Sequence, residues 1–292
     1  MIYSIRLTIT HRYDGPAANS RHLIRVVPKL IPSRQIPSVL LFEMAPYPDA
    51  RRDGVDFFGN PTTTCVQTAP HNEMSIRLAC NVEMIAPTPW FDASPQVAVM
   101  RAQWQSCTDL GPAAPVHFLG PTLRLLPDQA ITDFARGLYD PAASVAQNVI
   151  RIGQTLHMIM TFDSHATTVK TEAGEAFALK RGVCQDFSQI MILALQAIDI
   201  PAAYVSGYLR TLPPPGGVKL AGADAMHAWV RAWCGNEQGW IEYDPTNATL
   251  VGTDHIVVGY GRDYSDISPV SGHLRASGGQ RNSQSVDVAL LD

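Results

Sequence analysis

Alternating apolar and polar residues mark the first 85 residues of the chain. Ile5–His11 alternates with a period of two, as a strand with one buried face does. Further strand candidates are rich in apolar and β-branched residues: Leu23–Leu30, Val39–Met44, Thr62–Thr68 and Met74–Met84. Turn-forming residues lie between them: Tyr13–Pro16, Asp53-Gly54 and Gly59-Asn60. Several short strands at this spacing predict an all-β sandwich or barrel.

A helical pattern follows a proline-rich linker. Residues 86–95 hold three prolines, which remove backbone donors and predict a domain boundary. Beyond the linker, Asp128–Tyr139 has an acidic start and periodic apolar residues. A stronger helix is predicted over Ser144–Phe162, with Ser144 as its N-cap, because apolar residues recur every three or four positions. A third helix is predicted from Val183 to Ile198.

Strands return after the helices. Ala202–Leu209 and His255–Tyr260 are two candidates, and Met226–Cys234 and Gly239–Asp244 flank a glycine-containing turn that predicts a hairpin. The tail beyond Gly272 is rich in serine, glycine and glutamine, so we expect it to be loose for most of its length.

These patterns predict an α+β protein with two domains. Residues 1–90 are expected to form an all-β sandwich or barrel, and residues 91–292 a core of helices packed on an antiparallel sheet, with the C-terminal tail attached to the core. A length of 292 residues is enough for both domains to bury a core of their own.

Composition and charge narrow the class of function. The net charge is −4 and the pI about 6.1, which argues against a nucleic-acid or anionic membrane partner. No apolar run approaches the roughly 20 residues of a membrane span, and the N-terminus has no signal-peptide pattern. The five cysteines form no CxxC pair and no disulfide framework, so we expect a cytoplasmic protein.

A cysteine at the start of the third predicted helix is the first candidate for chemistry. The free N–H groups and the dipole of a helix N-terminus stabilise a thiolate, which makes Cys184 a candidate nucleophile. Gly182 before it lets another chain approach the sulfur. The competing interpretation is that Cys184 is a small buried hydrophobic residue.

The predicted hairpin brings a histidine and an aspartate together. In an antiparallel pair whose loop is Gly235–Gln238, His227 and Asp244 lie within a residue or two of directly opposite. A thiolate needs a base to exchange its proton, and the base works best when a third group orients it. Taken alone, His227 is also typical of a structural strand histidine and Asp244 of a turn residue.

Five ordered motifs give the chain a family resemblance: Gly182–Phe187, Tyr204–Leu209, His227–Val230, Asp244–Asn247, and Asp254–Ile256 continuing to Gly261–Tyr264. With these motifs the chain resembles the bacterial transglutaminase-like superfamily, a group of predicted cysteine proteases. His11–Asp14 and Asp56–Asn60 resemble the β-rich domain that precedes the core in this group. Arg231 is a departure, since an acidic residue is common there.

The resemblance implies a papain-like core with Cys184 as nucleophile, His227 as base and Asp244 as its orienting group. The implied activity is acyl transfer through a thioester, so the protein would be a cysteine protease, an amidase or a transglutaminase. The implied partners are a peptide or protein substrate and, in transamidation, an amine acceptor. Hydrolysis is favoured over cross-linking, because an amine acceptor needs a site that excludes water.

Two other functions stay open at this point. The same three residues suit a small-molecule N-acyltransferase, and an unreactive Cys184 would indicate a binding or assembly module that keeps the fold. No metal or other cofactor is expected, because no short ligand spacing such as HxxxH supports one. Asp254-His255 is assigned either to shaping the site or to hydrogen bonding within the strand layer. The loop Thr211–Ala221 is the candidate lid.

Overall fold

One long strand, β1 (Ile2–Ile24), organises the N-terminal domain in the computed structural model, which describes residues 1–86, 89–211 and 226–291. The first half of β1 pairs with β5 (His71–Met84) and β14 (Gln280–Leu290). The second half pairs with β4 (Pro61–Gln67) and β13 (Val270–Arg275). The two halves of β1 therefore pair with different strands, and this change of partners bends the sheet.

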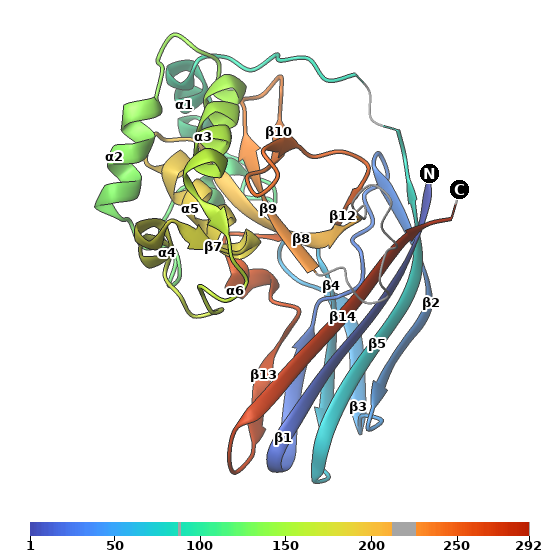
Figure 1. Ribbon diagram of the computed structural model, residues 1–292. Helices are drawn as coiled ribbons and strands as arrows, with labels where there is room; N and C mark the ends of the chain where they lie inside the picture. The colour runs from blue at the N-terminus through green and yellow to red at the C-terminus, as the bar shows by residue number, and fades with distance from the viewer. Residues whose placement is uncertain (87–88, 212–225, 292) are drawn as a thin grey trace, which may run out of the picture.

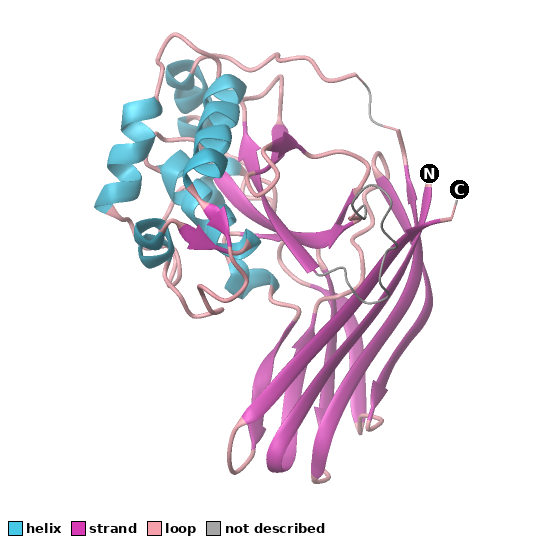
Figure 2. Ribbon diagram, in the orientation of Figure 1, coloured by secondary structure: helices cyan, strands magenta, loops and turns pink. Residues whose placement is uncertain are grey.

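The strands of this domain form a half-barrel (Figures 1 and 2). β2 (Gln35–Ala45) and β3 (Ala50–Val55) complete the order β2-β5-β1-β4-β3. The predicted alternation of β1 is confirmed, because its odd-numbered residues from Tyr3 to Ile9 are buried. The predicted turn at Tyr13–Pro16 is wrong: β1 continues through it with a register shift between Arg12 and Ala17, and it changes partners there. Asp53-Gly54 is likewise part of β3 rather than a turn.

The C-terminal tail is a component of the N-terminal sheet. β13 and β14 pair with β1, and Val286 and Val288 are buried in that domain's core. The expectation of a loose tail attached to the core was wrong. The polar composition of the tail gives no strand signal, but the tail forms strands because β1 supplies the backbone hydrogen bonds along its length. The two ends of the chain therefore lie side by side (Figure 1). The domain boundary near residue 90 stays a prediction.

The core domain places helices on one face of an antiparallel sheet of order β11-β10-β9-β8-β12 (Figure 2). The strands are β8 (Ala202–Leu209), β9 (Met226–Trp233), β10 (Trp240–Asp244), β11 (Thr249–Leu250) and β12 (His255–Gly261). The helices are α1 (Val97–Gln105), α2 (Gln129–Leu138), α3 (Val145–Ile159), α4 (Ala173–Leu179), α5 (Cys184–Gln196) and α6 (Tyr264–Ile267). A short helix η1 (Pro115–Phe118) and the strand pair β6 (Thr161–Phe162) and β7 (Arg181–Gly182) lie between them. The predicted α+β class is confirmed.

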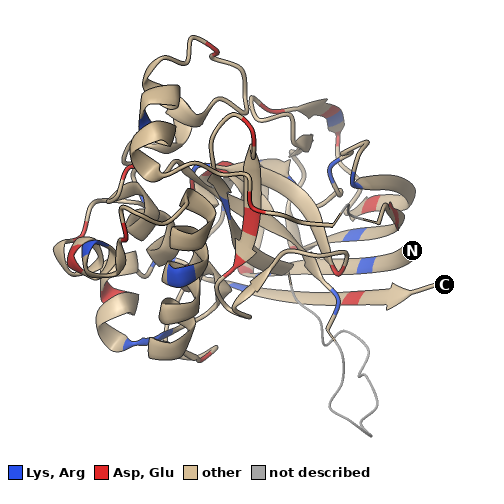
Figure 3. Ribbon diagram, turned by 90° about the horizontal axis from the view of Figure 1, so that it is seen from above, with Lys and Arg blue, Asp and Glu red and all other residues tan. Residues whose placement is uncertain are grey.

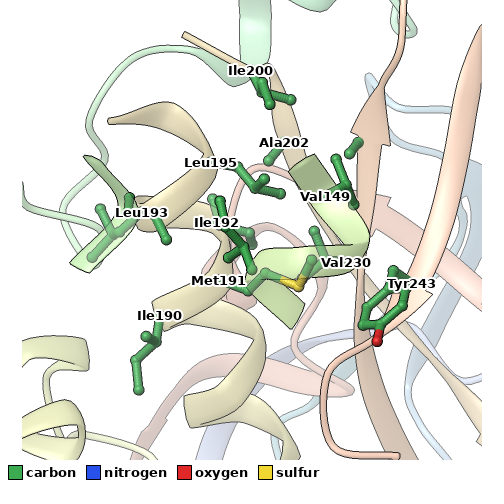
Figure 4. Packing of buried hydrophobic residues seen from close by; sticks show 14 of the residues in the cluster. Val149, Ile190, Met191, Ile192, Leu193, Leu195, Ile200, Ala202, Val230 and Tyr243 are labelled. Carbon is green, nitrogen blue, oxygen red and sulfur yellow. The ribbon is translucent and has the colours of Figure 1, made fainter. Parts of the chain in front are cut away.

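Helix α5 is the centre of the core. Eleven of its thirteen residues are buried, so it is covered on all sides rather than on one stripe. Figure 4 shows Met191 and Leu195 of α5 beside Val230 of β9 and Val149 of α3. The three predicted helices are confirmed, and Ser144 caps α3 in a capping box with Gln147. Helices α1 and α4 were not predicted.

Side chains of the N-terminal domain cover the open edge of the core sheet. The amide of Gln35 donates to the Val257 carbonyl at 2.7 Å and accepts from the Val257 N–H at 2.8 Å. Asn60 makes the same pair of bonds with Tyr260, at 2.7 and 2.9 Å. Because an unpaired edge strand leaves backbone groups unsatisfied, these two amides replace a missing neighbour strand along β12.

In the view of Figure 3, basic and acidic residues are interspersed along the chain, with neither kind gathered on one side. Among the described residues, no helix has the length and apolar character needed to cross a membrane.

A glycine in α3 offers a test of the packing beside the sheet. A Cβ at Gly153 would lie 2.1 Å from Cε1 of Tyr243, whereas nothing lies within 4 Å of one at Gly137 in α2. We expect Gly153→Ala to lower the free energy of unfolding by about 1–3 kcal/mol or more through overpacking. Gly137→Ala should raise it by about 0.5–1 kcal/mol. Urea unfolding measures both, and equal effects of the two variants would contradict the packing described.

Candidate active site

The start of α5 carries Cys184, which is half-buried and free of disulfides. Its backbone N–H belongs to the first turn, where a helix leaves its donors unpaired. The chain before it forms the short strand β7, so the sulfur lies at a strand-to-helix turn. The structure thus puts Cys184 where the helix dipole favours a negative charge.

Asp186 stabilises this turn. One of its oxygens accepts from the Val183 N–H at 2.8 Å and from the Thr167 hydroxyl at 2.6 Å. A Cβ at Gly182 would lie 2.5 Å from the same oxygen. The glycine therefore makes room for the Asp186 carboxylate, and not for another chain as the sequence suggested. Burial raises the pKa of Asp186, against the lowering effect of these hydrogen bonds.

The β9–β10 hairpin brings His227 and Asp244 together. Tyr243 lies opposite Val230, so His227 and Asp244 are diagonal neighbours on one face of the hairpin. His227 Nε2 lies 2.8 Å from Asp244 Oδ2. The predicted proximity of these two residues, within a residue or two of directly opposite, agrees with this register.

The Cys184 side chain lies close enough to the His227 ring to influence its pKa. Because Nε2 is hydrogen-bonded to Asp244, Nδ1 is the ring nitrogen left to face the sulfur. Burial by itself lowers the pKa of His227, but the hydrogen bonds and charges of Asp244 and Cys184 raise it to about 10. The arrangement therefore favours an imidazolium between a carboxylate and a sulfur.

Asp244 is completely buried and saturated with donors. Its Oδ1 accepts from the backbone N–H groups of Thr246 at 2.9 Å and Asn247 at 3.2 Å. Its Oδ2 accepts from the Asn247 side chain at 2.7 Å in addition to His227. Burial raises the pKa of Asp244, but these bonds outweigh it and hold the pKa far below its usual value. Asp244 is thus a fixed carboxylate. The sequence motif contains Asn247, but no signal in the sequence assigned it this role.

A third side chain, His255, was only partly anticipated. Its Nε2 lies 3.1 Å from Asp244 Oδ2, so it hydrogen-bonds within the strand layer and at the same time borders the site. Trp229 packs against both rings, with centroids 5.3 Å from His255 and 6.1 Å from His227.

His227, Asp244 and His255 offer ligand types that zinc accepts, with candidate atoms within 4.8 Å of one another. Each of those atoms is already used in a hydrogen bond of the network, so the set is explained without an ion. The expectation that no metal is needed stays a prediction.

Two other predicted features have separate outcomes. The departure Arg231 does not border the cysteine: its guanidinium lies between the rings of Trp240 and Tyr260, at 4.5 and 4.4 Å. Most of the candidate lid Thr211–Ala221 lies outside the described residues.

A cysteine at the start of a central helix, facing a histidine on an adjoining antiparallel sheet, defines the class of papain-like thiol enzymes. Comparison with known proteins agrees with this class. The family model described as "Transglutaminase-like superfamily" matches residues 132–245, and that of the "Bacterial transglutaminase-like N-terminal region" matches residues 3–83.

Relatives cover most of the chain. An uncharacterized protein of Mycobacterium tuberculosis is 33% identical over 78% of this chain and 73% of its own length. One of Mycobacterium leprae is 28% identical over 98% of this chain and 99% of its own length. A solved structure of a candidate cysteine protease from Cytophaga hutchinsonii shares the fold, with a TM-score of 0.74 at 20% identity, covering 100% of this chain and 91% of that one. The chain belongs to the transglutaminase-like superfamily and carries its bacterial N-terminal domain.

The raised pKa of His227 allows a test of whether the Asp244 carboxylate stabilises the imidazolium. We expect Asp244→Asn to bring the pKa of His227 from about 10 down toward or below the ordinary value of 6.5, because the charge and the hydrogen bond that favour the imidazolium are lost. NMR titration of the ring measures this pKa.

The same pKa shift makes the free energy of unfolding depend on pH. The folded pKa lies above that of the unfolded chain, so the proton on His227 stabilises the fold fully below pH about 6.5 and loses this effect as the pH rises to about 10. Wild type should therefore lose unfolding free energy over this window relative to Asp244→Asn. An Asp244→Asn protein in which His227 still titrates near pH 10 would refute the account.

Proposed function

We propose that the protein is a thiol-dependent amide-bond enzyme in which Cys184 is the nucleophile, His227 the general base and acid, and Asp244 the residue that orients His227. The observation that carries the proposal is the position of Cys184 beside His227, whose Nε2 is hydrogen-bonded to the buried Asp244. Membership of the transglutaminase-like superfamily supports it.

The reaction begins with attack of the Cys184 sulfur on the carbonyl carbon of an amide. The oxyanion that forms takes a hydrogen bond from the free Cys184 N–H at the helix start. His227 then gives its proton to the leaving nitrogen, the C–N bond breaks, and the acyl group stays on sulfur as a thioester.

The second half releases the acyl group. His227 removes a proton from the incoming acceptor, whose oxygen or nitrogen attacks the thioester carbonyl carbon. The C–S bond then breaks, and Cys184 is regenerated as a thiolate beside the protonated His227. Water gives a carboxylic acid, and an amine gives a new amide. We favour hydrolysis of a peptide or protein substrate, because transamidation requires a site that keeps water out.

Alkylation by iodoacetamide tests the reactivity of the sulfur. We expect Cys184 to be labelled below pH 7 at least about tenfold faster than Cys107, because the His227 imidazolium and the helix start both favour a negative charge on the attacking sulfur. Cys107 is the internal reference, since it is also half-buried and free. Mass spectrometry of the digested protein assigns the label.

Two variants complete this experiment. His227→Ala should bring the labelling rate of Cys184 to that of Cys107, whereas His273→Ala, which removes an exposed histidine of β13 in the N-terminal sheet, should leave the rate unchanged. Labelling of Cys184 only near pH 8.5, the range of a free thiol, with no effect of His227→Ala, would reject the proposed enzyme and favour a binding module.

A further inference from the structure

The hydrogen bond between His255 and Asp244 joins a second histidine to the proposed site. His255 Nε2 lies 3.1 Å from Oδ2, the same oxygen that His227 Nε2 approaches to 2.8 Å. His255 is the first residue of β12, which is separated from β10 by two other strands. The contact therefore spans the sheet, and chain proximity does not account for it.

The direction of this bond follows from the chemistry of the two groups. Asp244 remains a carboxylate and can only accept, so Nε2 of His255 carries the proton and donates it. Nδ1 of His255 is buried and has no hydrogen-bond partner among the described residues. Among the described residues, the His255 ring therefore makes its side-chain hydrogen bond through Nε2 alone.

The ring of His255 is held by contacts besides the one to Asp244. Trp229 packs edge-on against it, and the Arg34 guanidinium of the N-terminal domain donates to the His255 carbonyl at 3.2 Å. Two residues further along β12, Val257 is paired with Gln35. Several groups besides Asp244 therefore fix the donor in place.

Fixing Oδ2 has a consequence for His227. Backbone N–H groups hold Oδ1 of Asp244, but the direction of Oδ2 is set by Asn247 and His255, and this oxygen orients the His227 ring. We propose that His255 is a positioning residue: it holds Asp244 Oδ2 against His227 Nε2 and so keeps the His227 ring aligned with Cys184. This inference rests on the proposed function and adds a fourth side chain to it.

A pair of amide substitutions tests the donor itself. His255→Gln puts an amide N–H near the position of Nε2, and His255→Asn puts one near that of Nδ1, which faces away from Asp244. The two variants are similar in polarity and differ in reach. The readouts are the NMR titration of His227 and the rate of Cys184 alkylation by iodoacetamide at pH 6–7, with thermal unfolding as the control for folding.

We expect His255→Gln to stay within about threefold of the wild-type alkylation rate and His255→Asn to lose about tenfold, since a misplacement of about 1 Å is enough for such losses. The pKa of His227 should fall in His255→Asn and be restored in His255→Gln. A purely structural role would lower the thermal stability of the two variants without this difference between them.

Any of four results would overturn the proposal. Equal alkylation rates in His255→Gln and His255→Asn would show that the donor position does not matter. A rise in the pKa of His227 in His255→Asn would show that His255 only screens the charge of Asp244. A wild-type Cys184 that is no more reactive than Cys107 would reject the proposed enzyme and this inference together, whereas an activated wild type with unaffected variants would reject this inference alone.

Discussion

The buried carboxylate of Asp244 is the constraint around which the site is built. A carboxylate without access to water is costly unless donors surround it, and here the donors come from a turn, from Asn247 and from two histidines. Each donor fixes a piece of chain: the β10–β11 turn, the start of β9 and the start of β12. The geometry of three strand ends therefore follows from satisfying one negative charge.

The same sheet also explains why the N-terminal domain matters to the core. Edge strand β12 obtains its missing hydrogen bonds from Gln35 and Asn60 rather than from another strand. Beside them, Arg34 forms an ion pair with Glu242 at 2.7 Å, and Glu242 in turn accepts from Trp229. Because a half-buried ion pair of this kind is expensive to break on one side, the half-barrel and the core are expected to unfold together.

Local pattern was sufficient for most of the core. The apolar period identified α2, α3 and α5, and the register of the predicted hairpin was enough to place His227 near Asp244. The failures concern contacts that no local pattern encodes. The polar tail becomes β13 and β14 only because β1 offers it hydrogen-bonding partners, and His255 meets Asp244 although two strands of the sheet separate β12 from β10.

The central claim is that Cys184 takes up an acyl group with the help of His227 and Asp244. The most direct measurement is peptide mapping by mass spectrometry after brief exposure to p-nitrophenyl acetate and quenching in acid. The account predicts one acetyl group on Cys184, removed by hydroxylamine as a thioester is, and formed much more slowly in Asp244→Asn. Acetylation of other residues only, or acetylation of Cys184 at the same rate in Asp244→Asn, would contradict it.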